Sequence, residues 1–261
     1  MDVCFPRISG YEPEAYLPIL FEEMKRILFV LHSDSDGSPL ASDFMRFQGI
    51  ELETVTPFSE SAIPKDLSNF DAIVTVGNTE TARDDDFVEK EVELLRQALH
   101  TNVPVLGIAL GARILAQACY ASWCKNEVRR TGWTRVLLTQ EGRRDILFYG
   151  LPSAMDFFHV HGETLEAPHG ALLLARSEEC PVQAFRYANA YGLSFHMDVT
   201  PVMMRKWAGT TEERERSLRY GEVMAADVAA HTRAIYGNFL WLIDICRSEG
   251  YTKRKSRNRL V

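Results

Sequence analysis

The chain has 261 residues, enough for one large α/β domain or for two small ones. Its net charge of −7 argues against nucleic acid or an anionic membrane as the main partner. Its apolar runs are too short to span a bilayer, and its first residues lack the basic and apolar regions of a signal peptide, so we expect a cytoplasmic protein.

The first half of the chain alternates segments of strand-like and helix-like pattern. Apolar runs predict strands over 26–31, 71–76 and 103–108, and apolar residues at helical spacing predict helices over 86–100 and 110–120. Strands that alternate with helices in this way are typical of a parallel sheet covered by helices.

The second half of the chain has a different pattern of apolar and turn residues. Short strand-like runs separated by turn residues occupy 133–139, 155–161, 171–175, 183–187 and 191–196, which suggests hairpins added to the parallel core. From Pro201 onward the pattern is helical, with a long segment over 212–247. No linker or repeat interrupts the chain. We therefore expect one domain over 1–261, with a core over 26–247 and a basic tail over 248–261, of which 252–259 form a frayed terminus.

Residues 103–111 combine a short apolar strand, a Gly-x-x-x-Gly turn and the start of a helix. This is the layout of a nucleophile elbow, a sharp turn that exposes its central residue. The central residue here is Ala109, which has only a methyl group. Thiol or hydroxyl chemistry from this position is therefore excluded.

Five segments resemble, in order, those of class I glutamine amidotransferases, the Cys-His-Glu family that includes γ-glutamyl hydrolases. They are 107–111, 132–139, 158–164, 180–185 and 191–200. The segment 158–164, Phe-His-Val-His-Gly-Glu-Thr, is similar to that of guanylate-synthase amidotransferase domains and γ-glutamyl amide hydrolases. The resemblance implies a three-layer, flavodoxin-like α/β fold with a mostly parallel central sheet plus added hairpins, and no cofactor.

The resemblance also implies roles for particular residues. In this family a thiolate attacks the γ-carboxamide of glutamine, and a histidine oriented by a carboxylate carries the proton. Ala109 stands at the nucleophile position, His196 at that of the base and Asp198 at that of the acid. His196 and Asp198 would point to the same side if they lie on an extended strand.

Further residues are expected around the substrate. The oxyanion loop of the family corresponds to Gly77 and Asn78, and the Leu110 N–H would be a second donor. Arg113 stands where the family often has a glutamine that contacts the substrate, and His161 and Glu163 are expected at the rim of the pocket. His159 and His161 share one strand face, but a metal needs at least three ligands, so we expect no metal.

Several positions depart from the family pattern. Asp198 is one methylene shorter than glutamate, and Arg130 stands where a glutamate is usual. A laboratory cysteine-to-alanine change would explain only Ala109, so the set favours natural divergence. Five scattered cysteines predict reduced thiols, and none of Cys119, Cys124 and Cys180 is placed to replace the nucleophile.

Three functions stay open on these residues. The chain is an amidotransferase or γ-glutamyl amide hydrolase without its nucleophile, a natural pseudoenzyme that binds a small ligand or a partner subunit, or a re-purposed enzyme that uses His196 and Asp198. The expected ligand is glutamine or a γ-glutamyl-like molecule. A synthase partner or a homo-oligomer is compatible with each function.

Overall fold

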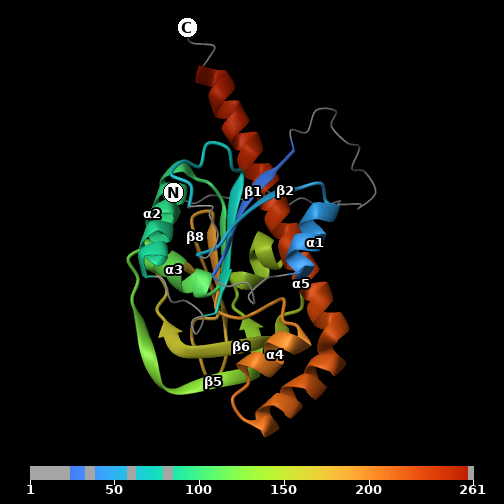
Figure 1. Ribbon diagram of the computed structural model, residues 1–261. Coiled ribbons are helices and arrows are strands. Elements are labelled where there is room, and N and C mark those ends of the chain that lie inside the picture. Colours follow the sequence, from blue (N-terminus) through green and yellow to red (C-terminus); the bar gives the residue numbers. More distant parts are fainter. Residues whose placement is uncertain (1–23, 33–38, 58–62, 79–84, 258–261) are drawn as a thin grey trace.

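The computed structural model describes residues 24–32, 39–57, 63–78 and 85–257 (Figure 1). These residues form a nine-stranded sheet with the order β2-β1-β3-β4-β9-β8-β7-β5-β6. Five neighbouring strands pair in parallel: β2 (Glu51–Val55), β1 (Arg26–Leu31), β3 (Ala72–Gly77), β4 (Val105–Ala109) and β9 (Ala190–Leu193). The sheet then continues with antiparallel pairs through β8 (Ala184–Tyr187), β7 (Leu172–Arg176), β5 (Trp123–Leu138) and β6 (Ala154–Leu165).

Helices cover both faces of the parallel strands, which makes three layers. On one face, Ile27 and Phe29 pack in a core with residues of α1 (Pro39–Phe47) and α5 (Thr211–Arg257). On the other, Leu28 and Val30 pack with α2 (Asp85–Thr101) and α3 (Leu110–Ala118). Alternate residues of β1 thus enter opposite cores, which explains its unbroken apolar run. The three-layer α/β expectation is confirmed.

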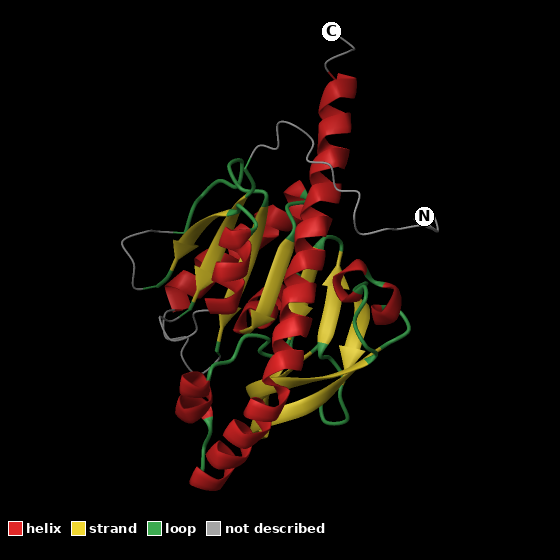
Figure 2. Ribbon diagram, turned by 90° about the vertical axis from the view of Figure 1, so that its right-hand side faces the viewer, coloured by secondary structure: helices red, strands yellow, loops and turns green. Residues whose placement is uncertain are grey.

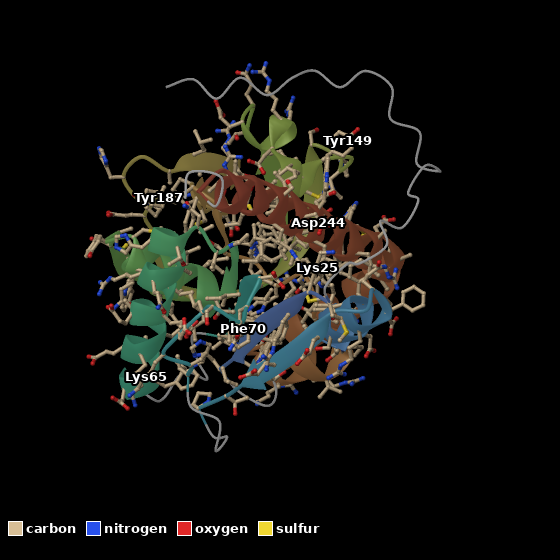
Figure 3. All side chains as sticks on the ribbon, turned by 90° about the horizontal axis from the view of Figure 1, so that it is seen from above. Lys25, Lys65, Phe70, Tyr149, Tyr187 and Asp244 are labelled. Carbon is tan, nitrogen blue, oxygen red and sulfur yellow. The ribbon has the colours of Figure 1, made fainter. Side chains whose placement is uncertain are left out.

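Helix α5 runs along the sheet over the length of the molecule, and its C-terminal end projects beyond the sheet (Figures 1 and 2). An ion pair joins it to the residues before β1, because Lys25 Nζ lies 2.8 Å from Asp244 Oδ1 (Figure 3). Of the frayed terminus that we expected over 252–259, residues up to Arg257 belong to this helix. No helix in the described part of the chain is long and apolar enough to cross a membrane.

Sequence patterns located most elements but not all. The strand over 26–31 and the helix over 110–120 correspond to β1 and α3, whereas α1 and β2 were not predicted. Strand β2 is an edge strand in which Val55 alone is fully buried, so it has no apolar run to detect. The hairpins are present in β5–β8, but β9 joins the parallel core beside β4.

Short elements complete the chain. Two 3-10 turns, Gly142–Arg144 and Ile146–Phe148, connect β5 to β6. Helix α4 (Pro201–Trp207) precedes α5, and it begins with proline in its first turn and with Thr200 as its N-cap. Thr200 Oγ1 accepts a hydrogen bond of 3.2 Å from the Met203 N–H. This cap fixes the point at which the segment after β9 turns into a helix.

Candidate functional site

The ends of three neighbouring strands bring several candidate residues to one edge of the sheet. Strands β3, β4 and β9 are adjacent and parallel, with Gly77 opposite Ala109 and Ile108 opposite Leu193. In open α/β sheets, the carboxyl ends of such strands form the usual ligand site. Gly77, Asn78, Ala109 and the segment that follows Leu193 therefore lie around the same edge.

The turn at Ala109 has the backbone geometry of an elbow. Ala109 has φ 53° and ψ −106° and stands immediately before helix α3. This positive φ is costly for a residue with a Cβ. Crowding explains the flanking glycines. A Cβ on Gly107 would lie 2.6 Å from the Gly111 carbonyl oxygen, and a Cβ on Gly111 would lie 2.2 Å from the Thr75 carbonyl oxygen. The next residue, Leu110, is the first of α3, so its N–H has no acceptor within the helix.

His196 is held by the edge of the antiparallel part of the sheet. Its backbone N–H donates to the Phe158 carbonyl of β6 at 2.8 Å, and its side chain is 3% exposed. The imidazole packs on Trp207 of α4, with 4.7 Å between the ring centroids. The backbone bond and the ring contact together fix the position of this side chain.

His196 and Asp198 would point to the same side on an extended strand, but Asp198 does not lie on such a strand. Strand β9 ends at Leu193, and residues Met197 and Asp198 are in a bend. The physical reason is that the chain must turn here to begin α4 at Pro201. A carboxylate oxygen of Asp198 accepts a hydrogen bond of 3.1 Å from the Ala41 N–H in the first turn of α1, so this side chain joins two distant elements.

Arg113 lies on α3, four residues after Ala109 and therefore on a similar face of the helix. Its guanidinium carbon lies 4.7 Å from the ring centroid of Trp123, at the start of β5. Such a cation–π contact holds the side chain in place while it keeps its charge. The backbones of His161 and Glu163 belong to β6 and pair with Arg130 and Lys125 of β5, and these four side chains lie outside the described part of the structure.

A buried polar cluster next to the elbow was missed by the sequence analysis. Glu91 of α2 is 0% exposed, and its carboxylate accepts a hydrogen bond of 2.5 Å from the Thr75 hydroxyl and lies 2.7 Å from His32 Nε2. A Cβ on Gly77 would lie 2.8 Å from the Cβ of His32. The cluster therefore packs against Gly77, the residue that lies opposite Ala109 in the neighbouring strand. The sequence did carry a signal, because Glu91 interrupts the apolar face formed by Phe87 and Leu95.

Cys119, Cys180 and His159 are at least partly enclosed by other residues of the fold. Burial raises the pKa of the Cys119 thiol to about 11, and burial also raises the pKa of Cys180, which sits in the turn between β7 and β8. His159 Nε2 lies 3.0 Å from the amide oxygen of Gln183, whose amide nitrogen donates to Ser177. Among the residues that the structure describes, no group of three His, Cys, Asp or Glu side chains could hold a metal ion.

Comparison with known families finds a match to one family model. The model described as glutamine amidotransferase class-I matches residues 41–206. A glutamine amidotransferase-like protein of Salmonella typhimurium, YfeJ, is 26% identical over 182 residues, which are 67% of this chain and 76% of that protein. A glutamine-hydrolyzing GMP synthase subunit of Thermococcus kodakarensis is 35% identical over 101 residues, or 38% of this chain and 52% of that protein. The match thus covers about half the length of that synthase subunit.

Solved structures show the same fold. A glutamine amidotransferase from Thermotoga maritima has a TM-score of 0.73 at 22% identity, over 84% of this chain and 99% of that one. A glutamine amidotransferase from Methylobacillus flagellatus has a TM-score of 0.75 at 20% identity, over 84% and 96% of the two chains.

Proposed function

Because the chain belongs to the class I glutamine amidotransferase family, we propose that it uses the pocket of this family to bind a ligand without thiol-dependent turnover. One observation carries the proposal: Ala109 keeps the strained backbone of an elbow, at φ 53°, but has no attacking atom. Strained backbone persists where the surrounding structure enforces it, and it clusters at functional sites. A retained elbow without a nucleophile favours a retained pocket.

The ligand that we propose is glutamine or a γ-glutamyl-like molecule with a carboxylate. The charge of Arg113, held against Trp123 one turn along α3 from Ala109, supports this class. The Leu110 N–H at the start of α3, with Gly77 and Asn78 opposite, would face the carbonyl of the ligand. His196 and Asp198 complete the pocket and, without a thiol beside them, serve to shape it.

A partner and a compartment follow from the same proposal. Several relatives are named as GMP synthase subunits, so a synthase subunit is the partner that we favour, with a second copy of this chain as the alternative. The lack of disulfide bonds among the described cysteines supports a cytoplasmic location.

The test compares the chain as it stands with an Ala109→Cys variant, each incubated with glutamine and a panel of γ-glutamyl amines. Binding is measured by calorimetry, and released ammonia, released amine and any covalent thioester by mass spectrometry. We expect the chain as it stands to bind without turnover and the cysteine variant to form a γ-glutamyl thioester, because the attacking atom is the part that is missing. The matched control is Ala109→Cys combined with His196→Ala, which should release no product.

Other outcomes contradict particular parts of the proposal. Turnover by the chain as it stands, lost in His196→Ala, would show a re-purposed enzyme instead of a binding protein. A cysteine variant that forms no thioester with any γ-glutamyl compound would exclude the proposed ligand class.

A further inference from the structure

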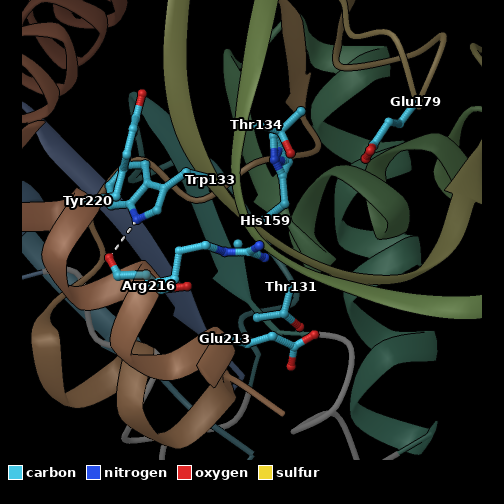
Figure 4. A pocket seen from close by; sticks show the side chains of 10 residues that line it. Thr131, Trp133, Thr134, His159, Glu179, Glu213, Arg216 and Tyr220 are labelled. Carbon is cyan, nitrogen blue, oxygen red and sulfur yellow. Dashed lines mark hydrogen bonds between the residues drawn. The ribbon is translucent and has the colours of Figure 1, made fainter. Parts of the chain in front are cut away.

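A cavity lies between the β5–β6 hairpin and the first turns of α5 (Figure 4). Its volume is about 510 Å³, and it is lined by side chains that include Thr131, Trp133, His159, Glu179, Glu213 and Arg216. The described residues that line it include none of the candidate residues around Ala109. Its volume falls within the range of about 300–1,000 Å³ that is usual for small-molecule sites. The cavity is therefore large enough for a ligand of its own.

Arg216 supplies a positive charge to this cavity. Figure 4 shows its side chain extending from α5 toward His159 on β6. Among the described residues, Arg216 has no hydrogen-bond or ion-pair partner. His159 is held in orientation by its contact of 3.0 Å with Gln183. An arginine that spans a polar cavity in this way is suited to bind a carboxylate in a bidentate manner.

Two carboxylates line the same cavity. Glu213 lies beside Thr131, and Glu179 lies farther away, beyond His159 (Figure 4). Glu213 is fixed at the start of α5, because its carboxylate accepts a hydrogen bond of 2.8 Å from the Thr210 N–H while Thr210 Oγ1 accepts one of 3.2 Å from the Glu213 N–H. This reciprocal cap fixes the Glu213 carboxylate at the start of α5, in the lining of the same cavity as Arg216.

A cation and fixed anions around one cavity complement a ligand that carries both charges. We propose that this cavity binds a free α-amino acid, with its carboxylate on Arg216 and its ammonium group facing Glu213. The Thr131 and Thr134 side chains line the same space and offer hydroxyl groups to the ligand. The proposal is independent of the ligand at Ala109.

A hydrogen bond links the β5–β6 hairpin to α5 beside the cavity, and the hairpin also bonds to the backbone of His196. Trp133 Nε1 donates to the Ser217 carbonyl at 2.9 Å, which joins β5 to α5. Phe158, the neighbour of His159, accepts the backbone hydrogen bond of His196. An amino acid that orders this hairpin therefore acts on the segment that carries His196, and Trp133 offers a fluorescence signal for binding.

The test uses L-alanine, L-leucine and L-lysine, which lack the γ-carbonyl of the ligand proposed for Ala109. Calorimetry and tryptophan fluorescence measure their binding to the full chain, beside the N-acetyl and carboxamide derivatives, which each lack one charge. We expect at least one amino acid to bind about tenfold or more tightly than either of its derivatives, and Arg216→Ala and Glu213→Gln each to weaken binding about tenfold or more. Glu213→Gln retains an amide oxygen for the cap of α5.

Two arginines serve as matched controls. Arg219 lies on the same helix outside the cavity, 3.6 Å from Glu215, so Arg219→Ala should leave binding unchanged. Arg113→Ala should also leave it unchanged, because Arg113 lies beside the elbow. Absence of binding by all three amino acids, or equal binding by the Arg216 variant, would overturn the inference. Binding lost in Arg113→Ala but kept in Arg216→Ala would place the amino acid at the elbow and also overturn it.

Discussion

Ala109 combines a costly backbone conformation with a side chain that cannot react. Its φ of 53° is maintained by the packing of Gly107 and Gly111 against their neighbours. A nearby thiol could restore chemistry only if it were ionised and accessible. Cys119 is neither placed nor ionised for that role, since it lies at the far end of α3 and burial raises its pKa to about 11.

This difference in cysteine reactivity can be measured. Because its pKa is about 11, only about one Cys119 thiol in a thousand is a thiolate at pH 8. Cys124 is exposed on β5. We expect iodoacetamide at pH 8 to alkylate Cys124 at least about tenfold faster than Cys119, as read by peptide mass spectrometry. Urea-unfolded protein is the control, in which the two rates should converge. Similar rates in the folded protein would contradict the raised pKa of Cys119.

At the scale of elements, the elbow depends on close contact between β3, β4 and α3. The missing side chain of Gly111 allows α3 to begin against the carbonyl of Thr75, on the strand beside β4. Thr75 in turn donates to Glu91 of α2, so the same strand residue meets both helices of this face. The turn therefore depends on three elements, and its conformation is not a property of residues 107–111 alone.

A glycine-to-alanine pair tests this packing. Gly111→Ala places a Cβ 2.2 Å from a backbone oxygen, so we expect the free energy of unfolding to fall by about 3 kcal/mol or more. Gly237→Ala is the matched control within α5, where the nearest atom would be 3.9 Å away. It should raise stability by about 0.5–1 kcal/mol, because alanine favours a helix. Urea denaturation measures both, and a Gly111 variant as stable as the parent would refute the crowding.

At the scale of the whole molecule, α5 connects regions that are far apart in the sequence. The Thr232 hydroxyl donates to the Met197 carbonyl at 2.7 Å, and the Asn238 amide donates to the Leu147 and Tyr149 carbonyls at 2.9 Å each. Thr232 is 0% exposed, so its bond is shielded from water. Through this contact the long helix supports the bend that carries His196 and Asp198.

Removal of the Thr232 hydroxyl should loosen that bend. Thr232→Val leaves the Met197 carbonyl without this donor, and we expect a loss of about 1–3 kcal/mol in stability. Amide hydrogen exchange over 194–200 should also become faster. Thr101→Val is the control, because Thr101 is exposed and its hydroxyl donates only to carbonyls of its own helix, those of Gln97 and Ala98 in α2. If exchange at 194–200 is unchanged in the Thr232 variant, α5 does not support the bend.

The sequence by itself determined the features that depend on short-range patterns. The apolar run of β1, the glycines around Ala109 and the order of the family segments are local, because burial and steric limits act on neighbouring residues. They were sufficient for the three-layer fold and the family, and for the alanine at the centre of the elbow. Strand β2 was not predicted because Val55 alone is fully buried, which leaves the strand without an apolar run.

Only the tertiary structure decided which distant groups meet. Asp198 bonds to Ala41, 157 residues away, and Glu91 meets Thr75 and His32 in a shared core. The cavity at Arg216 forms because α5 returns to the β5–β6 hairpin. Such contacts depend on how whole elements pack, and no local spacing encodes which buried polar group will find which partner.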